Sequence, residues 1–466
     1  MATPLGGGLV IAGERSGVGK TTVTLALLAA LRQRSQRVQS FKVGPDYIDP
    51  MFHRWVTGRP CYNLDPLLTS APYVQQSFQN HCRDAEFALV EGVMGLFDGA
   101  AGDSEVGSTA QIAKLLQLPV LLVIDCSRLS RSVLAIVQGY RNFDPALTLA
   151  GVVLNRVGSD RHLELLKTAL ANLDLPILGV LQRQDAITIP SRHLGLVPTA
   201  ELTQFQELVQ RLAHLGQHSF DWSGLEAWLR VRPSTRALPP PQTRSAPRVN
   251  QRPTAIAIAQ DAAFSFYYPD ALDYLTDLGV ELVPWSPLTD SQIPELASGL
   301  YLGGGFPEMF AAALADNQPL HHQIQTWVTR GMPTYAECGG LMYLAQSLVD
   351  LVGQSWPMVG ILPTAVQMAP RLTLGYRRAT AVLDSPFLRG GQSLWGHEFH
   401  RSETTGSSPQ PIYQLQRYGV QVPHAQEGWQ CYSVHASYVH VHWGGCPSLA
   451  QAFVQACRKF DRRAKP

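Results

Sequence analysis

The stretch that decides the fold is LVIAGERSGVGKTTVTLALLAALRQR, residues 9–34. It begins with a short apolar run, LVIAG (9–13), and passes through a glycine-rich loop that ends in GVGKTT. It continues as TTVTLALLAALRQR (21–34), whose apolar residues recur at helical spacing. A strand, a glycine-rich loop and a helix in this order are the context that a phosphate-binding loop requires. We therefore expect a nucleotide site at the edge of an α/β sheet.

The residue types of this loop suit a nucleotide polyphosphate. Backbone N–H groups and the amino end of the helix hold phosphate oxygens, Lys20 reaches the terminal phosphates, and Thr21 can bind Mg²⁺. Five residues separate Gly13 from Gly19, one more than the common spacing. We expect ATP or GTP as the ligand, with Mg²⁺. The residues expected around it are Gly13, Ser16, Gly17, Val18, Gly19, Lys20, Thr21 and Thr22.

Short runs rich in Val, Ile and Leu alternate with helical segments along both halves of the chain. In the first half these runs are 9–13, 37–43, 87–92, 120–125, 149–157 and 177–181. In the second half they are 255–259, 280–285, 299–305 and 333–340. Near-continuous apolar strands separated by helices predict parallel sheets covered on both faces. We expect an α/β fold in each half.

A proline-rich segment separates the two halves. RVRPSTRALPPPQTRSAPRVNQRPTA, residues 230–255, contains six prolines and no acidic residue. Proline fixes φ and removes a backbone donor, so this segment is expected to be extended and without a packed core. We expect an ATP-binding domain over residues 1–231, a linker over 232–253 and a second domain over 254–466.

Composition excludes several classes of protein. The 37 Lys+Arg against 36 Asp+Glu leave a formal net charge of +1, which argues against a nucleic-acid partner. No apolar run has the roughly 18–20 residues that span a bilayer, and the start, MATPLGGGLVIAG, lacks the basic region of a signal peptide. The 7 cysteines form no CxxC pair, which fits a reducing compartment. We expect a cytoplasmic enzyme that binds neither nucleic acid nor membrane.

Polar residues follow several of the predicted strands, where α/β sheets gather their chemistry. They are Lys42, Asp46 and Asp49 after the second strand, Glu91 and Asp98 after the third, and Asn155 at the end of a later one. Carboxylates beside a phosphate-binding loop can hold Mg²⁺ directly or through water. Lys42 can neutralise charge on a transferred phosphoryl group.

In the second half, Cys338 stands on a Glu-Cys-Gly-Gly turn between an apolar stretch and a run with helical spacing, GLMYLAQSLV. This arrangement is typical of a nucleophile elbow. The amino end of the following helix is expected to lower the pKa of the thiol and to stabilise an oxyanion. Glycines 303–305, after an earlier strand, can add another N–H donor. We expect Cys338 to be a nucleophile and the other cysteines to be structural.

A thiolate nucleophile needs an imidazole as its base. The run HASYVHVHWGG (435–445) offers His435, His440 and His442. Alternation along this strand-like run places His440 and His442 on one face, so periodicity does not choose between them. A separate run, GHEFHRS (396–402), lacks the histidine spacing of a zinc-binding HExxH helix, and we expect no metal there.

Several longer motifs run along the chain. They are AGERSGVGKTT, SFKVGPDYIDPMFH, LVEGVMGLFDG, RHLGLV (192–197), GGGFPE, YAECGGLMYL, LTLGYR, GHEFHRS and ASYVHVHW. Together these motifs resemble the cobyrinate a,c-diamide synthases, glutamine-dependent amidotransferases of cobalamin biosynthesis, and the resemblance covers nearly the whole chain. The first half also resembles dethiobiotin synthetase, which shares the longer phosphate loop, and the second half is similar to class I glutamine amidotransferases.

The resemblance implies that glutamine is hydrolysed at Cys338, with His440 as the base. The ammonia moves to the ATP site, where a substrate carboxylate has attacked the γ-phosphate of MgATP, and it displaces phosphate from the acyl phosphate. The reaction runs on the c and a side chains of the corrin. The resemblance further implies that Thr21, Asp46 and Glu91 hold the metal, that Lys42 contacts the nucleotide, that Asn155 reads adenine, and that Tyr47, Asp49 and Asp98 contact the substrate.

Several alternatives stay open. Hydrogenobyrinate and nickel-sirohydrochlorin a,c-diamide synthases share this scaffold, and cobyric acid synthase joins the same halves but fits FKVGPDYIDP and RHLGLV less well. A ParA/MinD-like ATPase switch shares the GVGKTT loop, with Arg15 at the place of its signature lysine, but has no glutaminase half. The chain is expected to be a monomer or a homodimer. Typical glutaminases carry Glu two residues after the catalytic His, where this chain has His442; the sequence offers Glu337 and Glu398 as substitutes without choosing between them.

Overall fold

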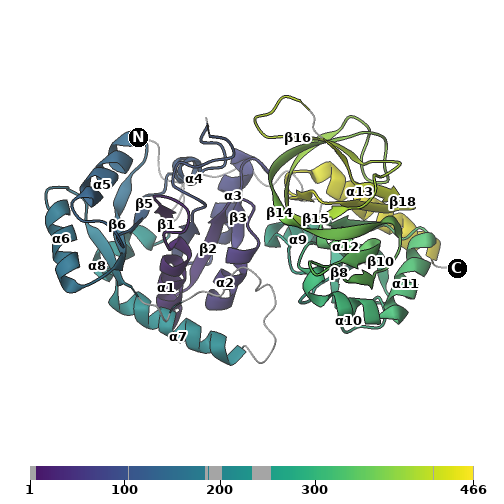
Figure 1. Ribbon diagram of the computed structural model, residues 1–466, viewed down its shortest axis with the longest axis horizontal. Coiled ribbons are helices and arrows are strands. Elements are labelled where there is room, and N and C mark those ends of the chain that lie inside the picture. The colour runs from purple at the N-terminus through teal and green to yellow at the C-terminus, as the bar shows by residue number, and fades with distance from the viewer. Residues whose placement is uncertain are drawn as a thin grey trace. The chain divides into compact units, whose positions relative to one another are not determined.

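The structure is a computed structural model that describes residues 7–102, 104–183, 187, 202–232, 253–422 and 425–464. The RHLGLV motif and all but the ends of the expected linker lie outside these residues. The chain divides into two compact units, the first running from β1 to α8 and the second from β8 to α13 (Figure 1).

The first unit contains a parallel sheet of seven strands, in the order β3-β2-β4-β1-β5-β6-β7. Its strands are β1 (Leu9–Gly13), β2 (Val38–Val43), β3 (Tyr62–Leu64), β4 (Phe87–Glu91), β5 (Val120–Asp125), β6 (Leu149–Val157) and β7 (Ile177–Gln182). Every neighbouring pair is parallel, which confirms the sheet predicted from the apolar runs. Only the short strand β3 had no counterpart among the predicted runs.

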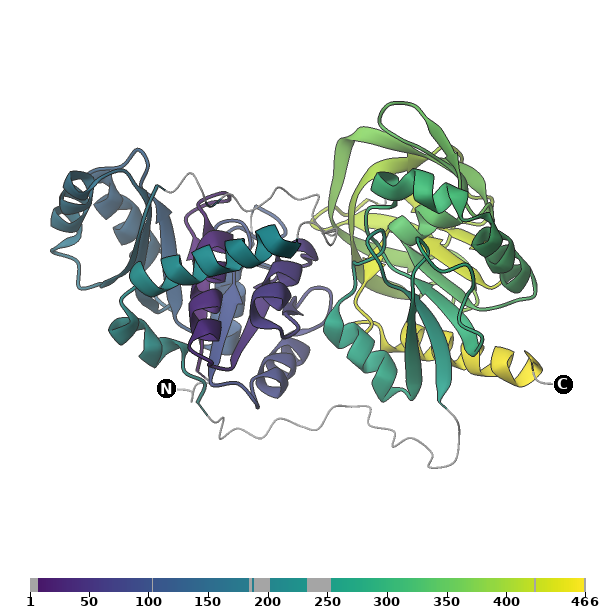
Figure 2. The ribbon, with the colours of Figure 1, turned by 90° about the horizontal axis from the view of Figure 1, so that it is seen from below.

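Helices cover both faces of this sheet (Figure 2). They are α1 (Lys20–Gln33), α2 (Ile48–Thr57), α3 (Ala71–His81), α4 (Thr109–Leu116), α5 (Ser132–Phe143), α6 (Asp160–Leu170), α7 (Leu202–His218) and α8 (Trp222–Leu229). From β1 the chain crosses to β2, toward one edge of the sheet, and from β4 it crosses to β5, toward the other edge. Because parallel crossovers are right-handed, the two connections lie on opposite faces. A crevice therefore opens between the carboxyl ends of β1 and β4, where such sheets bind ligands.

The second unit contains a six-stranded sheet whose order is β18-β19-β11-β10-β8-β9. Its strands are β8 (Thr254–Ala259), β9 (Val280–Trp285), β10 (Ala297–Leu302), β11 (Thr334–Glu337), β18 (Trp429–Cys431) and β19 (Val434–Ser437). All its pairs are parallel except β18 with β19. The accompanying helices are α9 (Pro269–Asp277), η2 (Pro307–Phe310), α10 (Ala311–Asp316), α11 (Gln318–Thr329), α12 (Gly339–Leu344) and α13 (Pro447–Ala464).

A further, mainly antiparallel sheet belongs to this unit and was not predicted. Its strands are β12 (Ala345–Val349), β13 (Ser355–Pro357), β14 (Leu362–Ala381), β15 (Ser393–Thr404), β16 (Tyr413–Arg417), β17 (Ala425–Glu427) and β20 (His440–Val441). Many of the residues of β14 are only partly buried or exposed, so the strand lacks the continuous apolar run that marked the parallel strands.

The second sheet corrects two local predictions. The helical run expected after Cys338 ends at Leu344, and the chain continues as β12, because pairing with β13 and β14 overrides the weak helical spacing. The strand-like run 435–445 is also broken. β19 ends at Ser437 in one sheet and β20 begins at His440 in the other, so His440 and His442 do not share one face of one strand.

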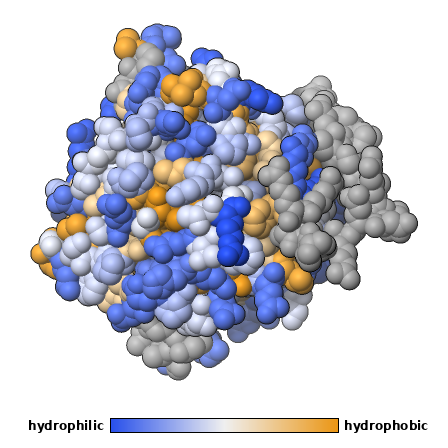
Figure 3. Space-filling model, turned by 90° about the vertical axis from the view of Figure 1, so that its right-hand side faces the viewer, coloured by the Kyte–Doolittle hydropathy of each residue, from blue (hydrophilic) through white to orange (hydrophobic). Residues whose placement is uncertain are grey.

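The face of the molecule shown in Figure 3 carries mainly hydrophilic side chains, with hydrophobic groups in small, scattered clusters. Within the described ranges, every helix is too short or too polar to cross a bilayer.

The contact between α1 and α7 predicts a stability effect. A Cβ added to Gly216 on α7 would lie 2.0 Å from the carbonyl oxygen of Ala26 on α1. Backbone cannot move aside as a flexible side chain does, so Gly216→Ala should cost about 1–3 kcal/mol and lower the midpoint of thermal unfolding.

The matched control is Gly139→Ala on α5, where nothing lies within 4 Å of the added methyl group. Alanine has the higher helix propensity, so this variant should keep or raise the midpoint. Equal midpoints for Gly216→Ala and Gly139→Ala would contradict the close packing of the two helices.

Candidate functional site

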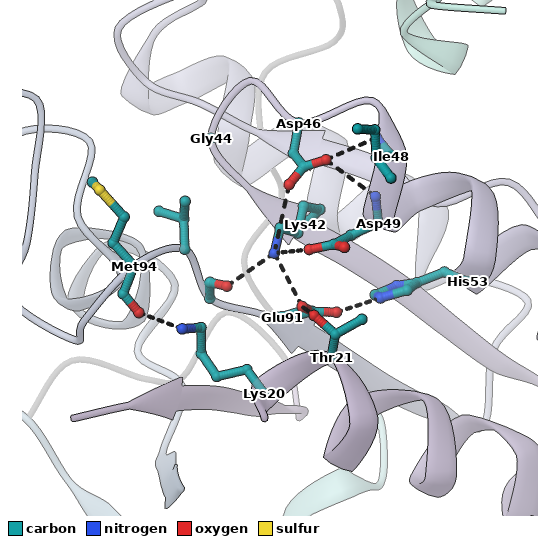
Figure 4. A network of polar contacts seen from close by, with 12 residues as sticks. Lys20, Thr21, Lys42, Gly44, Asp46, Ile48, Asp49, His53, Glu91 and Met94 are labelled. Carbon is teal, nitrogen blue, oxygen red and sulfur yellow. Dashed lines mark hydrogen bonds and ion pairs between the residues drawn. The ribbon is translucent and has the colours of Figure 1, made fainter. Parts of the chain in front are cut away.

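Two neighbouring strands bring Lys42 and Glu91 together at the crevice of the first unit. β2 and β4 pair in parallel with Lys42 opposite Glu91, and Lys42 Nζ lies 3.1 Å from Glu91 Oε1. Both side chains are buried. Thr21, in the first turn of α1, donates from Oγ1 to the same carboxylate oxygen at 2.8 Å (Figure 4). The phosphate-binding loop, β2 and β4 thus meet at one carboxylate.

Two further carboxylates surround Lys42. Its Nζ lies 2.6 Å from Asp49 Oδ2 and 3.9 Å from Asp46 Oδ2 (Figure 4). Burial alone would lower the pKa of Lys42, but Glu91, Asp49 and Asp46 outweigh it and hold this pKa above its ordinary value. Burial, followed by the charge of Glu91, raises the pKa of Asp49 to about 7. Lys42 is therefore a permanent cation, whereas Asp49 gains a proton near neutral pH.

His53 supports Glu91 from the other side, and the sequence analysis did not single it out. Its Nε2 lies 2.6 Å from Glu91 Oε2, and its Nδ1 lies 3.3 Å from Cys61 Sγ. Burial favours the protonated form of Glu91, but Lys42 and His53 outweigh that effect and hold the pKa of Glu91 below its ordinary value. The available signal was spacing, because His53 follows Asp49 by four residues and shares its face of α2.

Lys20 lies beside the loop that follows β4. Its Nζ donates to the carbonyl oxygens of Met94 and Arg15. Burial, and then the charge of Lys42, lower the pKa of Lys20 to about 8. Asp98 belongs to the same loop, where its Oδ2 accepts from the backbone N–H of Gly95 at 2.9 Å. An anionic polyphosphate here would relieve the repulsion between the two lysines.

The glycine that ends the phosphate-binding loop is required by its surroundings. Gly19 has a φ of 96°, and a Cβ there would lie 2.2 Å from Asn155 Nδ2. Asn155 donates this amide to the carbonyl oxygen of Val18 at 2.7 Å, so in the structure it holds the loop. Gly19 is also the N-cap of α1 and has no side chain to cap it, so the N–H groups of the first turn can face an anion.

The remaining predicted residues of the first unit lie close by in the chain. Gly13, Ser16, Gly17 and Val18 belong to β1 and the loop, Thr22 to the first turn of α1, and Tyr47 is a buried residue at the start of α2.

In the second unit, Cys338 occupies a sharp turn between β11 and α12. Its φ of 46° and ψ of −99° are rare for any residue but glycine, and strain of this kind costs roughly 1–3 kcal/mol. Gly340 packs against β10, since a Cβ there would lie 2.3 Å from the carbonyl oxygen of Leu302. The backbone of the turn is strained, and its packing against β10 fixes the position of Cys338.

The structure corrects the expected acidity of this thiol. Burial raises the pKa of Cys338 above its ordinary value, and the charges of Glu308, Glu337 and Glu398 add to the rise. The backbone N–H of Gly339 opposes them without outweighing them, because α12 is only 6 residues long and the thiol is almost wholly buried. Cys338 is therefore a neutral thiol at pH 7, and its activation needs a base.

His440 is the candidate base that the structure sets beside this turn. Its Nδ1 lies 3.7 Å from Oε2 of Glu337, the residue that precedes Cys338. A Cβ on Gly304 would lie 2.5 Å from His440 Cε1. A methyl group on Gly339 would lie 3.0 Å from the amide nitrogen of Gly305. His440, the Cys338 turn and the glycine loop after β10 therefore converge.

The other two histidines of the 435–445 run have different surroundings. His442 Nε2 lies 3.0 Å from Asp270 Oδ1. His435 stacks on Tyr335 with ring centroids 4.9 Å apart, and burial lowers its pKa to about 3. His435 is therefore a core histidine that stays neutral.

Glu398 has partners of its own. It accepts from Arg377 Nε and lies 3.5 Å from His400 Nε2.

Within the described residues, no group of three or more His, Cys, Asp and Glu side chains is arranged to hold a metal.

Comparisons with known proteins agree with this division of sites. Residues 9–197 match the CobQ/CobB/MinD/ParA nucleotide binding domain, and residues 255–447 match the CobB/CobQ-like glutamine amidotransferase domain. The chain is thus a glutamine-dependent amidotransferase with a nucleotide-binding half. The second domain is the part that a ParA/MinD-like switch lacks.

Relatives of nearly equal length define the family. The chain is 57% identical to a cobyrinate a,c-diamide synthase from Synechococcus sp., over 97% of this chain and 98% of that protein. It is 52% identical to one from Synechocystis sp., over 98% of this chain and 94% of that protein. A hydrogenobyrinate a,c-diamide synthase from Streptomyces coelicolor is 42% identical over 97% of both chains. The chain belongs to the cobyrinate a,c-diamide synthase family.

Proposed function

We propose that this enzyme amidates the a- and c-carboxylates of cobyrinate, using ATP and ammonia from glutamine, in cobalamin biosynthesis. The observation that supports this most is the presence, in one chain, of two separate reactive groups of side chains. One is the phosphate-binding loop with Thr21, Lys42 and Glu91; the other is the Cys338 turn with His440. Cobyrinate is proposed as the substrate because the chain belongs to the cobyrinate a,c-diamide synthase family.

At the second site, Cys338 Sγ attacks the carboxamide carbon of glutamine. Because the pKa of the thiol is raised, His440 must first accept its proton. The C–N bond then breaks, the imidazolium returns the proton to the departing ammonia, and water hydrolyses the thioester to glutamate. We assign the amide N–H of Gly305, which would lie 3.0 Å from a methyl group on Gly339, and the amino end of α12 to the oxyanion.

At the first site, an oxygen of the substrate carboxylate attacks the γ-phosphorus of ATP, and ADP leaves. Ammonia then attacks the acyl carbon, phosphate leaves, and an amide remains. A carboxylate is a poor acyl donor, so the phosphoryl group supplies the leaving group that it lacks. Lys20 and Lys42 offset the charge on the phosphoryl oxygens, and Lys42 is held charged by its three carboxylates.

Thr21 and Glu91 fit Mg²⁺, with Asp46 nearby. A hydroxyl and a carboxylate that already share a hydrogen bond are oxygen donors of the kind that Mg²⁺ takes beside nucleotide phosphates. When bound, the ion would neutralise charge on the β- and γ-phosphates. Lys42 and His53 hold the Glu91 carboxylate charged and oriented for this purpose.

The remaining assignments of the first site are also proposals. Asp49, which lies 2.6 Å from Lys42 and has a pKa raised to about 7, is assigned to the substrate side of the site. We assign Tyr47 and Asp98 to the substrate side as well, and Asn155 to adenine in addition to its hold on Val18. The nucleotide is ATP.

The domain limits proposed are 1–231 and 254–466, joined by the linker 232–253. The enzyme is proposed to act in the cytoplasm as a monomer or homodimer, on small molecules and without nucleic acid or membrane. The second candidate substrate is hydrogenobyrinate, which the Streptomyces coelicolor relative favours.

The substrate is tested by an amidation assay with purified protein, MgATP and glutamine. Cobyrinate should gain two amide groups, measured by product mass, while hydrogenobyrinate and nickel-sirohydrochlorin react more slowly. Faster amidation of either alternative would replace cobyrinate as the substrate, and no amidation of any of the three would contradict the proposed function.

Cys338→Ala should abolish glutamine-supported synthesis, because the nucleophile is lost, while synthesis with added ammonium salt continues at the wild-type rate. The measurement is amide product formed with each nitrogen source. Loss of activity with both sources would contradict separate sites for the two half-reactions.

Glu91→Gln should lower synthesis with either nitrogen source by roughly 100-fold or more, because the charge that balances Lys42 and faces the metal disappears. Glutamine hydrolysis at Cys338 serves as the internal control and should persist. Wild-type synthesis in Glu91→Gln would remove Glu91 from the phosphoryl-transfer site.

A further inference from the structure

A buried carboxylate joins the strand that ends at the nucleophile to the strand that carries the base. Glu337 is the last residue of β11 and is 1% exposed. Its Oε1 accepts from the backbone N–H of Val441 at 3.1 Å, and its Oε2 lies 3.7 Å from His440 Nδ1. The carboxylate of Glu337 thus contacts both the backbone of Val441 and the ring of His440.

The need for such a group follows from the chemistry of the base. When His440 takes the proton of Cys338, its ring becomes a cation, yet the side chain of His440 is fully buried. A buried cation without a nearby opposite charge is strongly disfavoured. Two residues further along, His442 stands where typical glutaminases carry their carboxylate, and it is paired with Asp270. A carboxylate from another part of the chain must therefore balance the positive charge on the ring of His440.

Two neighbouring elements bring titratable groups against His440. β11 brings Glu337, with Cys338 directly after it, and β15 brings His397, whose ring centroid lies 5.1 Å from that of His440. A neutral thiol and a second imidazole cannot offset a positive charge. Glu398, the other carboxylate offered by the sequence, is held by Arg377 and His400.

We propose that Glu337 is the positioning residue for His440, an inference that rests on the proposed glutaminase role of Cys338. Glu337 keeps the proton of the neutral ring on Nδ1, leaves Nε2 to accept the thiol proton, and stabilises the imidazolium that results. At 3.7 Å, Nδ1 and Oε2 are too far apart for a hydrogen bond, so the effect of Glu337 is electrostatic and is greatest when the ring is charged. Through its bond to Val441, the same carboxylate links the residue before Cys338 to the residue after His440.

Glu337→Gln separates the electrostatic effect of Glu337 on His440 from its hydrogen bond with Val441. The amide is of the same size, and its carbonyl oxygen can still accept from Val441, but its charge is gone. We expect kcat for glutamine hydrolysis to fall by on the order of 100-fold, with KM for glutamine within about twofold. Without the negative charge 3.7 Å from Nδ1, the imidazolium loses its stabilising partner, so the acid limb of the rate profile should move to lower pH.

Two controls accompany this variant. Ammonia-supported amidation by Glu337→Gln should equal that of the wild type, which shows that the protein is folded. Asp270→Asn removes the carboxylate that pairs with His442, and this variant should leave the acid limb of the rate profile unchanged.

A fall in kcat together with the shifted acid limb supports the proposal. Wild-type hydrolysis by Glu337→Gln, or a fall in kcat with an unmoved acid limb, would overturn it and leave Glu337 as an anchor for Val441. A wild-type enzyme that hydrolyses no glutamine would overturn both this proposal and the proposed function.

Discussion

The buried pair between Lys42 and Glu91 is the interaction on which the first unit depends. Neither charge is stable alone in the interior, and each is held by its neighbours: Lys42 by three carboxylates, Glu91 by Lys42, His53 and Thr21. This network joins β2, β4, α1 and α2 at the crevice where the strand order reverses. The requirement to balance buried charge thus fixes the relative positions of the side chains that are proposed to meet a phosphate.

The second unit solves a related problem with different groups. There the thiol of Cys338 is buried and its raised pKa keeps it neutral, so in the proposed mechanism charge arises only when His440 takes its proton. The strained turn, with Gly340 packed against β10, holds the residue that carries the sulfur in place. His440 and Glu337 come from strands of two different sheets. Under the proposed mechanism the ring of His440 gains a positive charge during turnover, and the buried carboxylate of Glu337 already lies 3.7 Å from it to balance that charge.

Much of this arrangement could be predicted from local sequence. Apolar runs marked the parallel strands closely; the predicted 120–125 and 149–157 coincide with β5 and β6. The antiparallel sheet was missed because many residues of β14 are partly exposed and carry no apolar run. The acidity of Cys338 was predicted with the wrong sign, because a helix end was considered without the burial that outweighs it. His53 was overlooked because its partner is distant in sequence.

By itself the sequence determined the phosphate-binding loop, the parallel strands and the Cys-Gly-Gly turn, because each depends on residues adjacent in the chain. Only the tertiary structure decided which groups support them. His53 and Glu91 are 38 residues apart, and Glu337 and Val441 are 104 apart. Such contacts depend on strand order and register, which no local pattern encodes. The choice of Glu337 over Glu398 as the neighbour of His440 was therefore made by the way β11 and β20 meet.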